Sequence, residues 1–233
     1  MTRSPTVRSL RDRIPRSGRP LGLLLAFTGM FLVSTDALLV RVAERDSAVD
    51  GWTIACMVGL FSSPVAWSLA VRNIGRDFGH ELVRWRRPLL VTGLLGAVGT
   101  TSFLTAVTLT ATSNVVAIIA SGPIFAAVLA RIALHERTSM RTWRAIGLTL
   151  IGIVVIVGGS MASGGIAGDL IALLAIMVFA VNLVLWRKYP DLPRTLVVAV
   201  TATCTFLLTA VPADTNLLDR RALLATLAMG GLF

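Results

Sequence analysis

Eight runs of apolar residues follow one another along this 233-residue chain, with short polar segments between them. Most runs reach the roughly 20 residues that a helix needs to cross a hydrocarbon core about 30 Å thick. None alternates strictly between apolar and polar positions, as a strand of a membrane barrel would. Because a lone span in lipid must satisfy its backbone groups internally, each run predicts a helix. The predicted spans are 21–40, 52–71, 88–108, 114–134, 143–159, 169–186, 195–212 and a start at 222–233.

The layout of the chain starts again after residue 167. Stretches 22–41 and 168–187 lie at an offset of 146, and each opens with Gly, continues apolar and closes with Arg. Five spans, an odd number, precede the second start, so the second copy enters the bilayer from the opposite side. Inverted repeats of this kind are typical of secondary transporters, whose site lies between the halves. We expect an all-α integral membrane protein with a first five-helix repeat over 21–160 and a partial second repeat over 168–233.

The positive charge follows the same alternation. The chain is 55% hydrophobic and carries a net charge of +10, and 18 of its 22 Lys and Arg residues lie before the first span or in every second loop. Such an excess marks the cytoplasmic side, which predicts a cytoplasmic N-terminus in a plasma-membrane protein. A topology signal with attraction to anionic headgroups explains the charge better than nucleic-acid binding does. Residues 1–20 and the first span resemble a signal peptide only superficially, because no small-x-small cleavage site follows. We therefore expect residues 1–20 to be a disordered basic tail ahead of a retained first helix.

Glycines are concentrated in two of the predicted spans. Gly93, Gly96 and Gly99 lie in 88–108, and Gly147 and Gly152 lie in 143–159. Helices in lipid associate through small residues that let their backbones approach closely. We therefore expect both helices to pack tightly through their glycines.

Asp36 is the acidic residue placed most clearly inside a span. Gly22 and Gly29 precede it by 14 and 7 positions and share its helix face. A carboxylate at membrane depth is costly and is a functional candidate by default, here for coupling transport to protons. The alternative is a hydrated Asp36 near the outer interface that caps the helix or pairs with Arg41.

Other polar residues could line a cavity between the helices. Asn182 stands 146 positions after Asp36 and is its counterpart in the second copy. It could contact a substrate, but a buried Asn most often bonds a neighbouring helix. Trp186 is not one of these candidates: like Trp52, Trp85 and Trp143, it lies near a predicted span end, where an amphipathic ring suits the headgroup layer. Thr and Ser hydroxyls can also bond back to their own helix, and a Pro inside a span kinks it. The remaining cavity candidates are Thr100, Thr101, Asn114, Ser121 and Pro123.

Residues 113–159 resemble the end of an EamA domain, the repeat unit of the drug/metabolite transporter superfamily. In that family a Pro in the fourth helix precedes a Leu-Gly-Glu turn and a Trp/Gly opening to the fifth helix, and here His135 replaces the usual Gly of the turn. The resemblance covers about 21–233. The matching residues are Ser113-Asn114, Pro123-Ile124-Phe125-Ala126-Ala127, Leu134-His135-Glu136-Arg137, Trp143, Gly147 and Ile151-Gly152.

The resemblance implies ten spans in two inverted repeats and alternating-access movement of small organic solutes such as amino acids, metabolites or drugs, commonly outward. It implies no cofactor, and it gives Glu136 a structural role beside nearby arginines. Because two spans of that plan are missing after Phe233, we expect a truncated sequence. A non-transporting remnant, an accessory protein or a homodimer that supplies the missing spans are alternatives. A membrane enzyme is disfavoured, since His80 and His135 lie in loops and no metal-ligand or paired-carboxylate cluster falls inside the spans.

Overall fold

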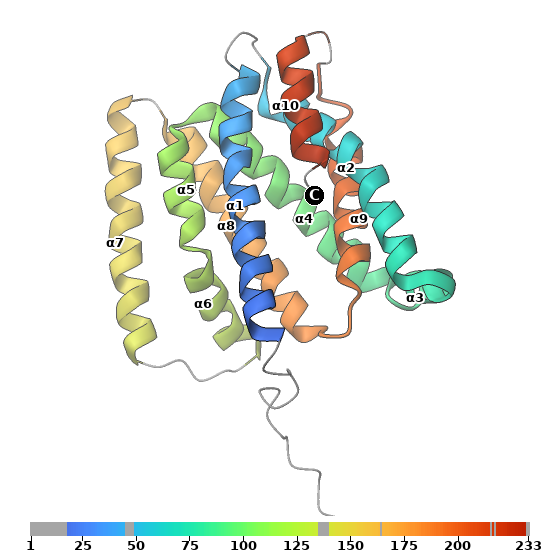
Figure 1. Ribbon diagram of the computed structural model, residues 1–233. Coiled ribbons are helices and arrows are strands. Elements are labelled where there is room, and N and C mark those ends of the chain that lie inside the picture. The colour runs from blue at the N-terminus through green and yellow to red at the C-terminus, as the bar shows by residue number, and fades with distance from the viewer. Residues whose placement is uncertain are drawn as a thin grey trace, which may run out of the picture. The chain divides into compact units, whose positions relative to one another are not determined.

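The computed structural model describes residues 18–44, 49–134, 140–163, 165–214, 216 and 218–231. Throughout these residues the chain forms helices joined by turns and short loops, with no strand, which confirms the all-α prediction. The chain divides between Asp36 and Ala37 into two units, and the second contains the bundle drawn from α2 onward in Figure 1. The predicted basic tail over 1–20 falls outside the described residues up to position 17.

The helices follow the apolar runs of the sequence. Four segments are long and apolar enough to cross a membrane, namely Gly51–Arg84, Arg86–Leu109, Thr112–Ala133 and Ile166–Lys188, and two shorter apolar helices cover Trp143–Gly159 and Arg194–Thr209. The arrangement of eight spans therefore stays a prediction. The helices are α1 (Gly18–Glu44), α2 (Gly51–Ile74), the short 3-10 turn η2 (Gly75–Asp77), α3 (Phe78–Arg84), α4 (Arg86–Leu109), α5 (Thr112–Ala120), α6 (Gly122–Leu134), α7 (Met140–Ser163), α8 (Ile166–Lys188), α9 (Arg194–Thr209) and α10 (Arg220–Gly231).

The predicted span 114–134 is divided into two helices at Ser121. The N–H of Ser121 donates to the carbonyl of Ile118 at 3.1 Å, which closes a tight turn at the end of α5. Pro123 has no N–H, so the regular helical bond back to Ile119 is missing. The carbonyl of Ser121 then accepts from the N–H of Ile124 at 2.9 Å as α6 begins. The helical bonding is therefore interrupted at this one turn residue, beside the Pro for which the sequence predicted a kink.

The larger unit is built on contacts between helices far apart in the sequence. α2 packs on α9 and on α10, α9 also packs on α4, and α4 packs on α8. On its other side α8 contacts α5, α6 and α7, so that α7 stands at one edge of the bundle (Figure 1). The helices of the predicted second repeat therefore lie directly against those of the first.

Glycines make the central contacts close. A Cβ atom added at Gly59 on α2 would lie only 2.7 Å from the backbone nitrogen of Phe206 on α9. Cβ atoms added at the three glycines of α4 would also lie too close to atoms of neighbouring helices, which confirms the tight packing expected of span 88–108. Their nearest obstructing atoms are Val200 Cγ1 at 2.5 Å for Gly93, Thr201 Cγ2 at 2.7 Å for Gly96 and Phe179 Cε1 at 2.6 Å for Gly99.

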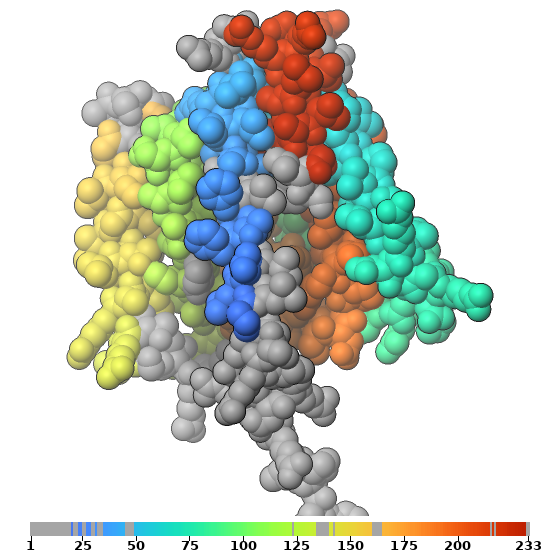
Figure 2. Space-filling view, viewed as in Figure 1, coloured from blue at the N-terminus to red at the C-terminus, as the bar shows by residue number. Residues whose placement is uncertain are grey.

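The glycines of α7 do not pack in this way. Within the described part of the chain, no atom outside the helix lies within 4 Å of a Cβ placed at Gly147 or Gly152. Leu148 and Val154 on the same helix are 73% and 69% exposed. In Figure 2 the side chains of α7 (yellow) stand at the edge of the molecule beside α5 and α6. The tight packing expected of span 143–159 was wrong, because its glycines face away from the neighbouring helices.

Candidate functional site

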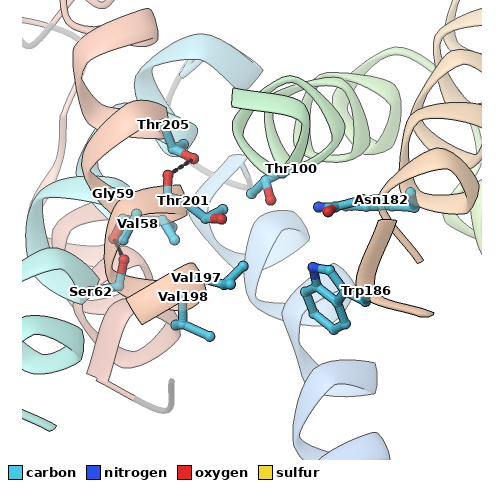
Figure 3. A pocket seen from close by; sticks show the side chains of 13 residues that line it. Val58, Gly59, Ser62, Thr100, Asn182, Trp186, Val197, Val198, Thr201 and Thr205 are labelled. Carbon is cyan, nitrogen blue, oxygen red and sulfur yellow. Dashed lines mark hydrogen bonds between the residues drawn. The ribbon is translucent and has the colours of Figure 1, made fainter. Parts of the chain in front are cut away.

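A cavity of about 210 Å³ lies inside the larger unit, between α2, α4, α8 and α9 (Figure 3). It is smaller than the roughly 300–1,000 Å³ of typical sites for drug-sized ligands. Most of its wall is apolar, and a few polar side chains enter it from all four helices. The apolar and small lining residues are Val58, Gly59, Gly96, Phe179, Val197, Val198 and Ala202, and the others are Ser62, Thr100, Asn182, Trp186, Thr201 and Thr205.

Two glycines form part of this wall. Gly59 on α2 and Gly96 on α4 lie in close contact with α9, beside Phe206 and Thr201. Larger residues at these positions would push the helices apart or fill the space. The same small residues that hold the helices together therefore also leave room for the cavity.

The hydroxyl groups on α2 and α9 are partly occupied by their own helices. Ser62 Oγ donates to the carbonyl of Val58 at 2.7 Å, and Thr205 Oγ1 donates to the carbonyl of Thr201 at 2.9 Å. Such back-bonding uses the hydroxyl proton but leaves acceptor lone pairs available. Ser62, Thr201 and Thr205 were not among the sequence candidates.

Asn182 combines the two roles considered for it. Its Nδ2 donates to the backbone carbonyl of Thr92 on α4 at 3.1 Å, so it bonds a neighbouring helix. It also lines the cavity, where its Oδ1 is buried without a hydrogen-bond partner. Figure 3 shows its amide facing the space that Thr100 enters from the other side.

Trp186 stands one helical turn after Asn182 and also lines the cavity. Its indole Nε1 is buried and has no hydrogen-bond partner. On the ring, the guanidinium carbon of Arg194 stacks at 5.0 Å from the centroid. From its place near a span end, the sequence predicted only that the ring of Trp186 suits the headgroup layer. The sequence did not predict that Trp186 lines the cavity.

Of the sequence candidates whose side chains the structure describes, Thr100 and Asn182 are the two that line the cavity. Thr101 is 4% exposed with its hydroxyl oxygen unpartnered, and Ser121 donates its hydroxyl back to the carbonyl of Ile118, as the alternative for such residues predicted. Asn114 lies in the first turn of α5 and Pro123 in the first turn of α6. Thr101 lies on α4 and Ser121 at the turn between α5 and α6, and the functional roles of all four residues stay predictions.

Asp36 is the last residue of the smaller unit, whereas the cavity lies wholly within the larger one. Its role in coupling therefore stays a prediction. The alternative partner proposed for it, Arg41, is engaged elsewhere: its guanidinium donates to Glu44 Oε2 at 3.1 Å, to Thr112 Oγ1 at 2.9 Å and to the carbonyl of Thr110 at 2.5 Å. Glu44 lies beyond the predicted span, and burial raises its pKa while the neighbouring Arg41 opposes that rise.

A second buried carboxylate escaped the sequence prediction. Asp169, in the first turn of α8, is 0% exposed, and neither carboxylate oxygen has a hydrogen-bond partner. The sequence places it at the first position of span 169–186, where nothing distinguishes it from a hydrated residue at a helix end. The His135-Glu136-Arg137 turn, with the structural role expected of Glu136, lies outside the described residues.

The family of the chain follows from comparison with known proteins. The model of the EamA-like transporter family matches residues 20–158, which is more than half of the chain. The chain belongs to the EamA-like transporter family. This EamA protein is thus a multi-pass membrane protein of the drug/metabolite transporter type, and its family supports a transporter rather than an enzyme. Neither the curated proteins nor the solved structures compared with it gave a match.

Proposed function

We propose that this EamA protein is a plasma-membrane permease that exports small organic solutes by alternating access around the cavity between α2, α4, α8 and α9. The observation that carries the proposal is that helices of both predicted repeats form the wall of the cavity. α2 and α4 belong to the predicted first repeat and α8 and α9 to the second. In transporters built from inverted repeats the substrate site lies at the interface of the repeats.

The helix contacts support the same arrangement. If the two repeats are copies, α2 corresponds to α9 and α4 corresponds to α10. Exchanging the copies maps the α2–α9 contact onto itself and the α4–α9 contact onto the α10–α2 contact, and all three are present. The alternation of basic loops supports the opposite orientations that such copies need, with the N-terminus in the cytoplasm.

Blocking the cavity tests the proposal. Thr100→Trp introduces a large side chain into the cavity from α4, and Leu94→Trp places the same side chain on an exposed position of that helix. Purified protein is reconstituted into liposomes, and flux is measured for a panel of neutral, cationic and zwitterionic solutes. We expect wild type and Leu94→Trp to transport at least one solute of the panel. The flux of that solute through Thr100→Trp should be at least about tenfold lower than through wild type.

Two results of this flux assay would contradict the proposal. Equal flux in Thr100→Trp and wild type would remove the cavity from the route. No flux in wild type across the panel would favour the non-transporting alternative. Size-exclusion profiles of all three proteins verify that a loss of flux is not a loss of fold.

Direction and access are tested with cysteine labels. In a background with Cys56 and Cys204 replaced by Ala, Thr100→Cys is exposed to a membrane-impermeant thiol reagent in right-side-out and inside-out vesicles. Alternating access predicts labelling from both sides and protection by substrate. Labelling from one side under all conditions would contradict it.

A further inference from the structure

Two polar atoms on α8 enter the cavity without partners. Asn182 and Trp186 are four residues apart and share a helix face. Asn182 as a residue is only 6% exposed, and both its Oδ1 and the Nε1 of Trp186 are buried without a hydrogen bond. In Figure 3 the indole nitrogen of Trp186 is directed toward the amide of Asn182.

The orientation of the Asn182 amide is fixed by its neighbour on α4. The backbone carbonyl of Thr92 can only accept a hydrogen bond, so the group 3.1 Å from it must be the Nδ2 of Asn182. The other end of the amide, Oδ1, is therefore an acceptor. Together with the indole N–H, α8 offers the cavity one acceptor and one donor, side by side.

Buried polar groups without partners are rare and call for an explanation. Leaving a donor or an acceptor unsatisfied in a protein interior is costly, because the group has lost its water without gaining a partner. Here the two groups are complementary to each other in kind and lie in the same cavity. A ligand that both accepts and donates would satisfy them at once.

The rest of the wall restricts the charge of that ligand. Among the described residues that line the cavity, none is Asp, Glu, Lys, Arg or His. An ionised group would enter an apolar space without a counter-charge, which is strongly unfavourable. The apolar part of the wall, including Val58, Phe179 and Val197, favours a mainly hydrocarbon body instead.

We propose that Asn182 and Trp186 form the recognition pair for an uncharged carboxamide on a small, mainly apolar solute. The indole N–H of Trp186 donates to the carbonyl oxygen of the ligand, and Asn182 Oδ1 accepts from its amide N–H. The inference deepens the proposed function and rests on it, because it names the substrate class of the same cavity. It disfavours zwitterionic amino acids and cationic drugs as substrates.

Benzamide and its close analogues test the pair. Binding is measured by isothermal titration to the full chain in lipid nanodiscs, with empty nanodiscs subtracted. Acetophenone keeps the carbonyl but lacks the N–H, benzyl alcohol presents a hydroxyl, and benzoate and benzamidine carry a charge. We expect benzamide to bind at least about tenfold more tightly than either charged analogue and more tightly than acetophenone or benzyl alcohol.

Two variants should separate the two hydrogen bonds. Trp186→Phe removes the donor and keeps an aromatic ring, so it should weaken benzamide and acetophenone alike by about fivefold. Asn182→Leu removes the acceptor and should weaken benzamide but not acetophenone. Trp67→Phe is the matched control, because Trp67 donates to Thr203 Oγ1 at 2.9 Å and does not line the cavity. It should leave all affinities unchanged.

Several results would overturn the inference. They are equal affinity for benzamide and acetophenone in every variant, tighter binding of benzoate or benzamidine, benzyl alcohol binding as well as benzamide, or no binding of any probe. A wild type that is stabler than Trp186→Phe, with unchanged benzamide affinity, would show instead that the pair satisfies itself. Binding of benzamide without flux of any solute would support the inference and contradict the proposed function. Flux of a different solute that is lost in Thr100→Trp, without benzamide binding, would support the proposed function and contradict the inference.

Discussion

α4 and α7 are both apolar helices of 24 residues with several glycines, yet they use those glycines differently. On α4 the glycines lie directly against side chains of α8 and α9, and one of them lines the cavity. On α7 the space beside Gly147 and Gly152 is open among the described residues. The comparison teaches that a glycine-rich apolar helix can pack closely but that its partner decides whether it does.

The largest expected effect lies on the surface that α9 shares with its neighbours. In Gly59→Ala the new methyl group would meet the backbone nitrogen of Phe206, 2.7 Å away, and backbone cannot turn aside as a side chain can. α2 and α9 must separate, at a cost of about 3 kcal/mol. Thermal unfolding in detergent should show a clear fall in Tm. An unchanged Tm would mean that the close contact of these helices is not needed.

A smaller loss is expected where the obstruction is a side chain. Gly93→Ala brings a methyl group 2.5 Å from Val200 Cγ1, which can shift, so the cost should be about 1–2 kcal/mol. Val200→Ala removes that obstruction. The double variant should recover part of the loss, and strictly additive losses would show that the two residues do not interact.

On α7 the expected effects are weaker. The guanidinium carbon of Arg131 on α6 lies 5.6 Å from the ring centroid of Trp143. Trp143→Leu should therefore cost only about 0.5–1 kcal/mol, and Trp143→Phe less, since it keeps an aromatic face. Urea or SDS titration of the two variants side by side measures the difference. A loss as large as that of Gly59→Ala would contradict the peripheral position of α7.

The smallest effect is expected at the open glycines. Gly152→Ala meets no neighbouring atom within 4 Å in the described part of the chain, and Ala is the better helix former. Stability should stay the same or rise by less than about 1 kcal/mol. A marked fall in Tm, or a change of oligomeric state in the same sample, would show that this face is covered in the assembled protein.

The fold was largely predictable because apolar length is a local property. Each apolar run corresponds to a helix, apart from the break at Ser121, where the missing N–H of Pro123 acts together with a tight turn. The site was predictable only in part. Thr100 and Asn182 stand out as polar residues in apolar spans, but Thr201 and Thr205 lie in a run with several threonines. Only the register of α9 against α4 distinguishes those that face the cavity.

The position of α9 also has a consequence for how the protein is made. α9 contacts both α2 and α4, and it follows α4 by roughly a hundred residues of chain. At about 5–20 residues per second, roughly 5 to 20 s pass between the synthesis of the two helices. During that interval Gly59 and the glycines of α4 have only lipid or other early helices beside them. The cavity therefore forms late in biogenesis. A ribosome that stalls before α9 leaves a chain in which the glycine-lined faces of α2 and α4 that α9 would cover are exposed.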